Sequence, residues 1–113
     1  MGNFLEELVY TLIQLVPVGK VTTYGSIAKI LNIHPRVVGR ILAKNERLIE
    51  IPCHRVVCSN GEIGGYSGGS IEFKAKLLKL EGVRIYVKNG KFYVSREDIV
   101  DLYARLFGNS RRS

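Results

Sequence analysis

Cys53 and His54 lie next to each other in the stretch Ile51–Val57, which reads IPCHRVV. The thiolate is the nucleophilic form of cysteine, and a free thiol has a pKa near ~8.5, so a reactive cysteine needs a group that favours loss of its proton. A histidine can accept that proton through a water if a carboxylate orients its other ring nitrogen. On these two residues alone, a buried cysteine beside a hydrogen-bonded core histidine remains the better interpretation.

The carboxylate that would orient His54 cannot be chosen from its position in the sequence. Glu81, just before Gly82, is one candidate. The alternatives are Glu46, Glu50, Glu62 and Glu72.

The composition indicates one folded domain with a basic surface. The chain has 113 residues, 46% of them hydrophobic, which is enough for a real core. Its 17 Lys and Arg exceed its 10 Asp and Glu, and the formal net charge is +7. This charge favours an anionic partner, nucleic acid first, although a basic surface that only aids solubility fits equally well.

Membrane, metal and disulfide classes find no support in the sequence. No apolar run would span a bilayer and no signal peptide opens the chain, so we expect a cytoplasmic protein without membrane contact. Cys53 and Cys58 are the two cysteines, too few for a disulfide framework or a structural zinc site. A disulfide between them is disfavoured in a reducing compartment. We expect neither metal nor cofactor.

The elements that must position these residues begin with three helices. Apolar residues at helical spacing predict a helix from Phe4 to Val16, ended by Pro17 and Gly19. Residues 20–23 should be extended, and Thr23 should cap a helix that runs to about Leu31. Pro35 suits the first turn of a further helix over residues 36–44. Two short helices joined by a tight turn predict a helix-turn-helix, with an ordinary helical hairpin as the alternative.

The second half of the chain should be irregular over residues 45–69 and regular after that. A helix is expected over residues 71–80, ending at Gly82, and a β-hairpin over 84–94 around the Asn89-Gly90 turn. Ser95 should cap a final helix that carries Ile99 to Phe107 and ends at Gly108. The fold class is therefore mainly α (α+β), a single domain over residues 1–113, with a mobile tail at 108–113.

Four ordered blocks of sequence resemble a known family. They read PVGKVTTYGSIA, PRVVGRILAKN, IPCHRVVCSNGEIGGYSGG and KLLKLEG. Together they resemble the active domain of the O6-alkylguanine-DNA alkyltransferases over about residues 5–82. The resemblance implies a winged-helix-like DNA-binding domain that repairs O6-alkylguanine in duplex DNA. It further implies irreversible transfer of the alkyl group to the protein's own cysteine.

The resemblance also implies a chemical role for four residues. Cys53 would be the nucleophile, and His54 would accept its proton through a water. Glu81 would orient His54. Tyr24 would protonate the leaving guanine at a ring nitrogen, because an unassisted guanine anion is a poor leaving group.

The remaining implied site residues would bind DNA and the flipped base. Arg36 would fill the gap left by the extruded guanine, whose extrusion costs a few kcal/mol, and Gly39 would let DNA approach closely. Asn45 would act as a hinge between the recognition helix and the active-site loop. The guanine pocket would be formed by Tyr66, Ser67, Gly68, Gly69 and the backbone carbonyls of Cys53 and Val56. Tyr24 and Ser59 would join the DNA-binding surface, while Cys58 would be structural.

Some positions depart from the family pattern. Val37 and Val38 make the recognition helix bulkier than the alanine-rich forms, and Leu48 occupies a position where a pocket proline is common. The hairpin and final helix of residues 83–107 lie beyond the matched blocks. We also expect the active domain without the N-terminal domain that the family usually carries.

Two other functions fit parts of the pattern. A non-catalytic alkyltransferase-like protein would bind alkylated DNA, but that class usually replaces the cysteine, often with tryptophan. A winged-helix transcription regulator would read the major groove sequence-specifically. We expect the repair protein, acting as a monomer on double-stranded DNA that carries O6-alkylguanine.

Overall fold

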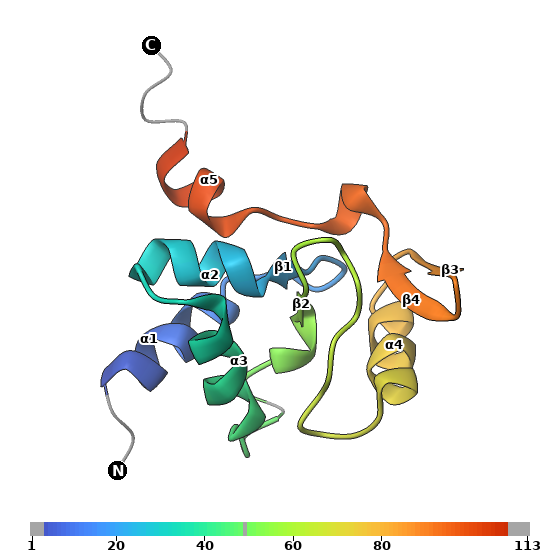
Figure 1. Ribbon diagram of the computed structural model, residues 1–113, viewed down its shortest axis with the longest axis horizontal. Coiled ribbons are helices and arrows are strands. Elements are labelled where there is room, and N and C mark those ends of the chain that lie inside the picture. Colours follow the sequence, from blue (N-terminus) through green and yellow to red (C-terminus); the bar gives the residue numbers. More distant parts are fainter. Residues whose placement is uncertain (1–3, 49, 109–113) are drawn as a thin grey trace.

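A computed structural model describes residues 4–48 and 50–108 as a mostly helical α+β domain (Figure 1). The α-helices are α1 (Phe4–Ile13), α2 (Tyr24–Leu31), α3 (Pro35–Ala43), α4 (Ile71–Leu80) and α5 (Leu102–Phe107). Two 3₁₀ turns, η1 (Cys53–Arg55) and η2 (Arg96–Asp98), lie between them. The strands are β1 (Thr22–Thr23), β2 (Val56–Val57), β3 (Ile85–Lys88) and β4 (Lys91–Val94). None of the helices in these ranges is long and apolar enough to cross a bilayer.

The expected helix-turn-helix is formed by α2 and α3, and local chemistry explains its boundaries. The Thr23 hydroxyl accepts a hydrogen bond from the Ser26 backbone N–H at 3.0 Å and caps α2. Asn32 ends α2 in the left-handed region at φ 58°. Pro35 opens α3, and the His34 ring Nδ1 accepts a bond from the Arg36 N–H at 3.0 Å. Both predicted helices are confirmed.

A short parallel pair of strands joins this motif to the Cys53 loop. Thr22 pairs with Val56, and Thr23 pairs with Val57. The pairing fixes the start of α2 beside η1, which carries Cys53. The prediction of an irregular segment over residues 45–69 missed η1 and β2, because two-residue strands have no periodicity to detect.

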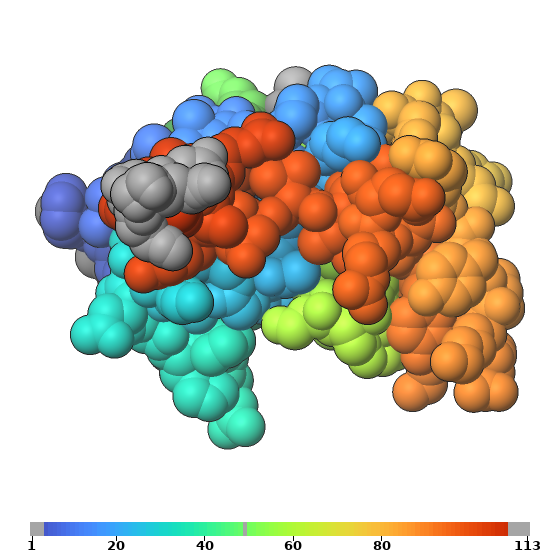
Figure 2. Space-filling model, turned by 90° about the horizontal axis from the view of Figure 1, so that it is seen from above, coloured from blue at the N-terminus to red at the C-terminus, as the bar shows by residue number. Residues whose placement is uncertain are grey.

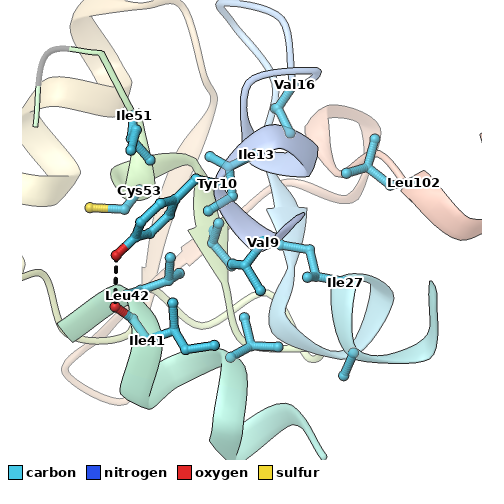
Figure 3. Close-up of a cluster of buried hydrophobic side chains, with 13 residues drawn as sticks. Val9, Tyr10, Ile13, Val16, Ile27, Ile41, Leu42, Ile51, Cys53 and Leu102 are labelled. Carbon is cyan, nitrogen blue, oxygen red and sulfur yellow. Dashed lines mark hydrogen bonds between the residues drawn. The ribbon is translucent and has the colours of Figure 1, made fainter. Parts of the chain in front are cut away.

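Two apolar clusters support the elements. The larger cluster joins α1, α2, α3, η1 and α5, and Figure 3 shows Cys53 at its edge. Its Tyr10 hydroxyl donates to the Ile41 carbonyl at 3.4 Å. The second cluster lies between α4 and the hairpin. It consists of Val21, Val57, Ile63, Ala75, Leu78, Val83 and Val94.

The hairpin is confirmed, with the two-residue turn that its sequence predicts. Lys88 pairs with Lys91, and Asn89 and Gly90 both have positive φ angles, 52° and 77°. Two positive φ angles in a two-residue loop match the right-handed twist of the strands.

The predicted final helix is present as α5 and is followed by Gly108, but it begins only at Leu102 and Ser95 does not cap it. Ser95 precedes only η2, and its side chain makes no capping hydrogen bond. The chain is then extended and bonded to Val21. The Val100 N–H donates to the Val21 carbonyl at 2.6 Å, and the Val21 N–H donates to the Asp98 backbone carbonyl at 2.8 Å. The helix α5 begins later, where the Asp101 carboxylate accepts a bond from the Ala104 N–H at 3.1 Å. The predicted mobile tail, apart from Gly108, lies outside the described residues.

Candidate active site

Cys53 lies at the start of η1, where the apolar core meets a cavity. Its residue is 5% exposed, and its sulfur points away from the labelled core side chains in Figure 3. The Sγ atom lies 3.7 Å from the Ser67 hydroxyl. Pro52 explains the abrupt turn, because its φ of −78° and ψ of 67° form an inverse γ-turn closed by a 2.8 Å bond from the Cys53 N–H to the Ile51 carbonyl.

His54 is held by the carboxylate that the sequence left as one of five. Its Nε2 lies 3.0 Å from Glu81 Oε2, and the residue is 8% exposed. Burial lowers the pKa of His54 against the opposing effect of Glu81, so the ring is neutral at neutral pH. With the Nε2 proton donated to the carboxylate, Nδ1 is left as the acceptor.

Glu81 is fixed from its other side by Arg55. The guanidinium donates from Nε to Oε1 and from Nη2 to Oε2, both at 2.9 Å, and from Nη1 to the Val16 carbonyl at 3.0 Å. Burial alone would raise the pKa of Glu81, but the hydrogen bonds from Arg55 and His54 bring it below the ordinary value. The sequence analysis missed Arg55, although a bidentate partner is what a half-buried carboxylate needs.

Lys74 is a second residue that the sequence analysis missed. It is 0% exposed, and its Nζ donates to the Val56 carbonyl at 2.8 Å and to the Gly65 carbonyl at 3.0 Å. Burial lowers its pKa to about 8. The sequence did contain a sign that Lys74 is buried, because on a helix it shares a face with the apolar residues Ala75 and Leu78.

A cavity of about 310 Å³ opens in front of the Cys53 thiol. Helix α3 contributes Gly39, Leu42 and Ala43 to its wall. The loop between β2 and α4, here called the active-site loop, contributes Gly65, Tyr66 and Ser67. Tyr24 closes one side, and burial raises the pKa of its phenol to about 12. The phenol therefore keeps its proton at neutral pH and can act as a hydrogen-bond donor.

Asn45 connects α3 to this cavity. The residue is 5% exposed. Its side-chain amide donates to the Ile51 carbonyl at 3.3 Å and its oxygen accepts from the Arg47 N–H at 2.9 Å. Its own carbonyl accepts a 3.5 Å bond from the Ser67 hydroxyl. The structure thus brings this residue between the helix and the loop, where the predicted hinge would lie.

Three predicted pocket residues lie outside the lining of this cavity. The Val56 carbonyl faces the Lys74 ammonium. A Cβ on Gly68 would come within 2.6 Å of the Tyr66 ring, and one on Gly69 within 2.9 Å of the Phe73 ring. The two glycines therefore permit the tight course of the loop, and a direct part of any of the three in base recognition stays a prediction.

The predicted DNA-binding residues gather on the adjoining outer surface. A shallow depression of about 350 Å³ is lined by Tyr24, His34, Pro35, Arg36, Gly39, Cys58 and Ser59. A Cβ built on Gly39 would meet no atom within 4 Å, so packing within the protein gives no reason for a glycine in α3. Tyr24 and Gly39 line both hollows and join them.

The described residues form neither a disulfide nor a metal site. Cys53 and Cys58 are both free thiols, and burial raises the pKa of Cys58. Within residues 4–48 and 50–108, no three His, Cys, Asp or Glu side chains gather in a way that would hold a metal ion.

Comparisons with known proteins agree on one family. Residues 5–83 match the family described as 6-O-methylguanine DNA methyltransferase, DNA binding domain. The methylated-DNA–protein-cysteine methyltransferase of Saccharolobus islandicus is 52% identical over 77 residues, which are 68% of this chain and 50% of that protein. The chain thus spans about half the length of the curated relative that it matches.

Solved structures of similar proteins extend the likeness to the fold. The O6-methylguanine-DNA methyltransferase from Pyrococcus kodakaraensis superposes with a TM-score of 0.65 at 48% identity, covering 72% of this chain and 47% of that one. Atl1 of S. pombe, in complex with damaged DNA containing O6-carboxymethylguanine, superposes with a TM-score of 0.77 at 28% identity. That match covers 88% of this chain and 97% of the other.

Proposed function

The chain belongs to the 6-O-methylguanine DNA methyltransferase family, and we propose that it repairs double-stranded DNA by moving the alkyl group of O6-alkylguanine onto its own Cys53. The observation that carries this proposal is the position of the Cys53 thiol. It faces a cavity of about 310 Å³, a size that falls at the lower end of small-molecule sites. His54, paired with Glu81, follows Cys53 in η1, and Tyr24 lines the same cavity as the thiol.

The proposed reaction is an in-line displacement at carbon. The Cys53 sulfur forms a bond to the alkyl carbon as the bond from that carbon to guanine O6 breaks, and the electron pair leaves with the guanine. The thiol proton passes through a water to His54, while Tyr24 gives its proton to a ring nitrogen of the leaving base. His54 and Tyr24 then return to their starting states, so the net change is one proton from Cys53 to guanine.

The surroundings of His54 suit a base in this reaction. Because burial lowers its pKa, the ring starts neutral with a free acceptor nitrogen. The ionised Glu81, at 3.0 Å, stabilises the imidazolium that forms. Arg55 keeps that carboxylate charged and in place through two hydrogen bonds of 2.9 Å.

The product explains why we expect a single turnover. A thioether is neither charged nor a useful leaving group, so the proposed reaction has no step that removes the alkyl group from Cys53. Each protein molecule would therefore accept one alkyl group. The reaction needs no cofactor, since the substrate itself supplies the electrophilic carbon.

The helix-turn-helix would present the damaged base. Arg36 lies exposed at the start of α3, beside the hollow that joins the thiol cavity through Tyr24 and Gly39. Extruding a base costs a few kcal/mol, and a stacked guanidinium offsets part of that cost. Asn45 would couple α3 to the active-site loop through its bond to Ile51. We expect the protein to act as a monomer.

A second candidate function has one observation in its favour. The fold superposes on Atl1, in complex with damaged DNA, with a TM-score of 0.77, and on the Pyrococcus methyltransferase with a TM-score of 0.65. A protein that recognises alkylated DNA without repairing it would therefore fit the architecture. The free thiol of Cys53 in the cavity favours transfer instead.

Intact-mass analysis after incubation with an O6-methylguanine duplex separates these functions. Repair predicts that each molecule gains one methyl group in place of one proton, on the peptide that contains Cys53. The Cys53→Ser variant should gain none, and the matched Cys58→Ser variant should still gain one. Binding of the duplex without any mass change would support the recognition protein, and methylation confined to Cys58 would overturn the assignment.

A further inference from the structure

The β3–β4 hairpin has an outward face whose chemistry the proposed repair reaction does not use. Paired residues in an antiparallel ladder share a face. Tyr86 pairs with Tyr93 and Lys88 with Lys91, and the two tyrosine rings stack at 5.5 Å. The alternate residues Ile85, Phe92 and Val94 instead contact the second apolar cluster. One face therefore anchors the hairpin while the other offers aromatic hydroxyls and cations.

This part of the chain is strongly basic. Residues 84–96 contain Arg84, Lys88, Lys91 and Arg96 and no Asp or Glu. Arg84 is bound to Asp98 at 2.9 Å, and Lys91 lies 3.8 Å from Glu62. Over the part of the chain that the structure describes, Lys88 and Arg96 take part in no ion pair. Two cations are thus available to an anion from outside the protein.

The hairpin is hydrogen-bonded to the loop between β2 and α4, and Ser59 of this loop lines the depression beside Arg36. The Val94 N–H donates to the Gly61 carbonyl and the Ile63 N–H donates to the Phe92 carbonyl, both at 2.9 Å. A depression of about 320 Å³ is lined by Ser59 and Asn60 of the loop, by Tyr86 and Val94 of the hairpin, and by Arg96, Ile99 and Asp101. The hairpin is therefore held in one position relative to the loop.

Ser59 connects this depression to the one beside Arg36. It lines both, so the surface runs without a break from the start of α3 to η2. Figure 2 shows that the start of α3 (teal) and the hairpin (orange) both project beyond the rest of the molecule on the same side, with part of the loop (yellow-green) between them. A long ligand seated on α3 would meet the hairpin.

We propose that the outward face of the β3–β4 hairpin, together with Arg96, is a second contact for the phosphate backbone of the duplex that α3 engages. The proposal rests on the proposed function, because it takes duplex DNA as the partner. The side chains of lysine, arginine and tyrosine are among those that bind DNA phosphates. Such contacts carry no sequence information. The hairpin raises affinity for damaged and undamaged duplexes alike and leaves the transfer step unchanged.

Salt dependence gives the proposal a quantitative test. Each phosphate contact that is lost lowers the slope of log affinity against log salt by ~0.9. The double variant Lys88→Gln/Arg96→Gln removes two exposed cations without breaking an ion pair. The matched control Lys76→Gln/Lys79→Gln removes two exposed cations from α4, which lines neither depression.

Binding to an undamaged duplex is measured by fluorescence anisotropy across a range of salt, and transfer to Cys53 is measured with the free base O6-benzylguanine. In the hairpin variant we expect the slope of log affinity against log salt to fall in magnitude by about two, and the affinity at low salt to fall roughly tenfold or more. The control should stay close to the wild type. Transfer from the free base should be equal in all three proteins. Equal slopes in the hairpin variant and the control would overturn the proposal while leaving repair intact. A wild-type protein that accepts no alkyl group and binds no duplex would instead overturn the proposed function and this proposal with it.

Discussion

Replacing Lys74 by methionine is expected to change how the stability of the domain depends on pH. Lys74 is fully buried on α4, and burial lowers its pKa from 10.5 to about 8. Between these two values the unfolded chain binds a proton that the folded protein does not. The free energy of unfolding must therefore rise with pH across this window, because stability rises wherever the unfolded state binds more protons.

The size of the effect follows from the same two values. The full difference corresponds to about 3 kcal/mol, which burial of the charged amine costs the folded protein below pH 8. From about pH 7 to about pH 9.5 the wild type should recover about 2 kcal/mol of this amount. Methionine has a similar length and no titratable group, so the Lys74→Met variant should lack this rise. The substitution also leaves the Val56 and Gly65 carbonyls without a donor, and this cost opposes the relief from burying a charged amine.

Urea unfolding of both proteins at several pH values over this range measures the effect. The quantity of interest is the change in the wild-type-minus-variant difference with pH, in which titratable groups that do not interact with Lys74 cancel. The variant Lys76→Met alters an exposed lysine on the same helix and should follow the wild-type profile. A constant difference between wild type and Lys74→Met would refute the buried, readily deprotonated amine and the reasoning based on it.

Three further predictions concern the site and the DNA surface. Gly39→Ala should raise the free energy of unfolding by about 1 kcal/mol, because alanine favours a helix and its Cβ meets no atom within 4 Å. The same variant should bind a duplex more weakly in anisotropy titrations. Unchanged affinity would show that DNA does not approach Gly39. Glu81→Gln should cost about 2 kcal/mol at neutral pH in urea melts, because Arg55 loses its anionic partner. It should also slow transfer to Cys53, because the His54 imidazolium loses the charge that stabilises it. Since the pKa of Glu81 is lowered, the wild type should lose this stability as pH falls through that pKa, and a variant with the same acid sensitivity would argue against the pair. Arg36→Ala should slow repair in a duplex more than transfer from a free O6-alkylguanine base, since stacking contacts are worth ~1–3 kcal/mol, and equal slowing of both reactions would exclude a role in base extrusion.

The parts of the fold that the sequence predicts are those whose causes are local. Thr23 caps α2 through a residue three positions away, and Pro35 opens α3 within its own turn. The Asn89-Gly90 turn places both positive φ angles at residues that tolerate them. Each of these boundaries follows from the conformational preferences of a few neighbouring residues, so no knowledge of the packing is needed.

The final helix shows where local causes fail. Ser95 followed by Glu97 and Asp98 carries the signals of a helix start. In the structure Asp98 binds Arg84 and Lys20. The residues after it pair with Val21, far away in the sequence. A backbone pairing at that separation outweighs the helical preference, and no pattern within the segment reports it.

The same distinction separates the site residues. The resemblance points to Glu81 as the partner of His54, but composition and spacing leave it among five carboxylates. The two residues are 27 positions apart, and only packing brings them together. Lys74 went unnoticed for a related reason. Its two acceptors are carbonyls of Val56 and Gly65, and backbone carbonyls exist at every position of the chain.

The bonds that hold residues 98–103 against the start of the helix-turn-helix also set the order in which the domain can assemble. Lys20 reaches Asp98 and Thr22 reaches Val100, each across 78 residues, and Ser26 reaches Asp101 across 75. Closing loops of this length precedes the gain from their contacts, which slows folding. During synthesis the N-terminal half of α2 leaves the ribosome well before the segment that fastens it, which follows 75 to 78 residues later. The helix-turn-helix therefore reaches its final form only when nearly the whole described chain has been made, and a nascent chain with Cys53 already outside the ribosome has no finished surface with which to meet DNA.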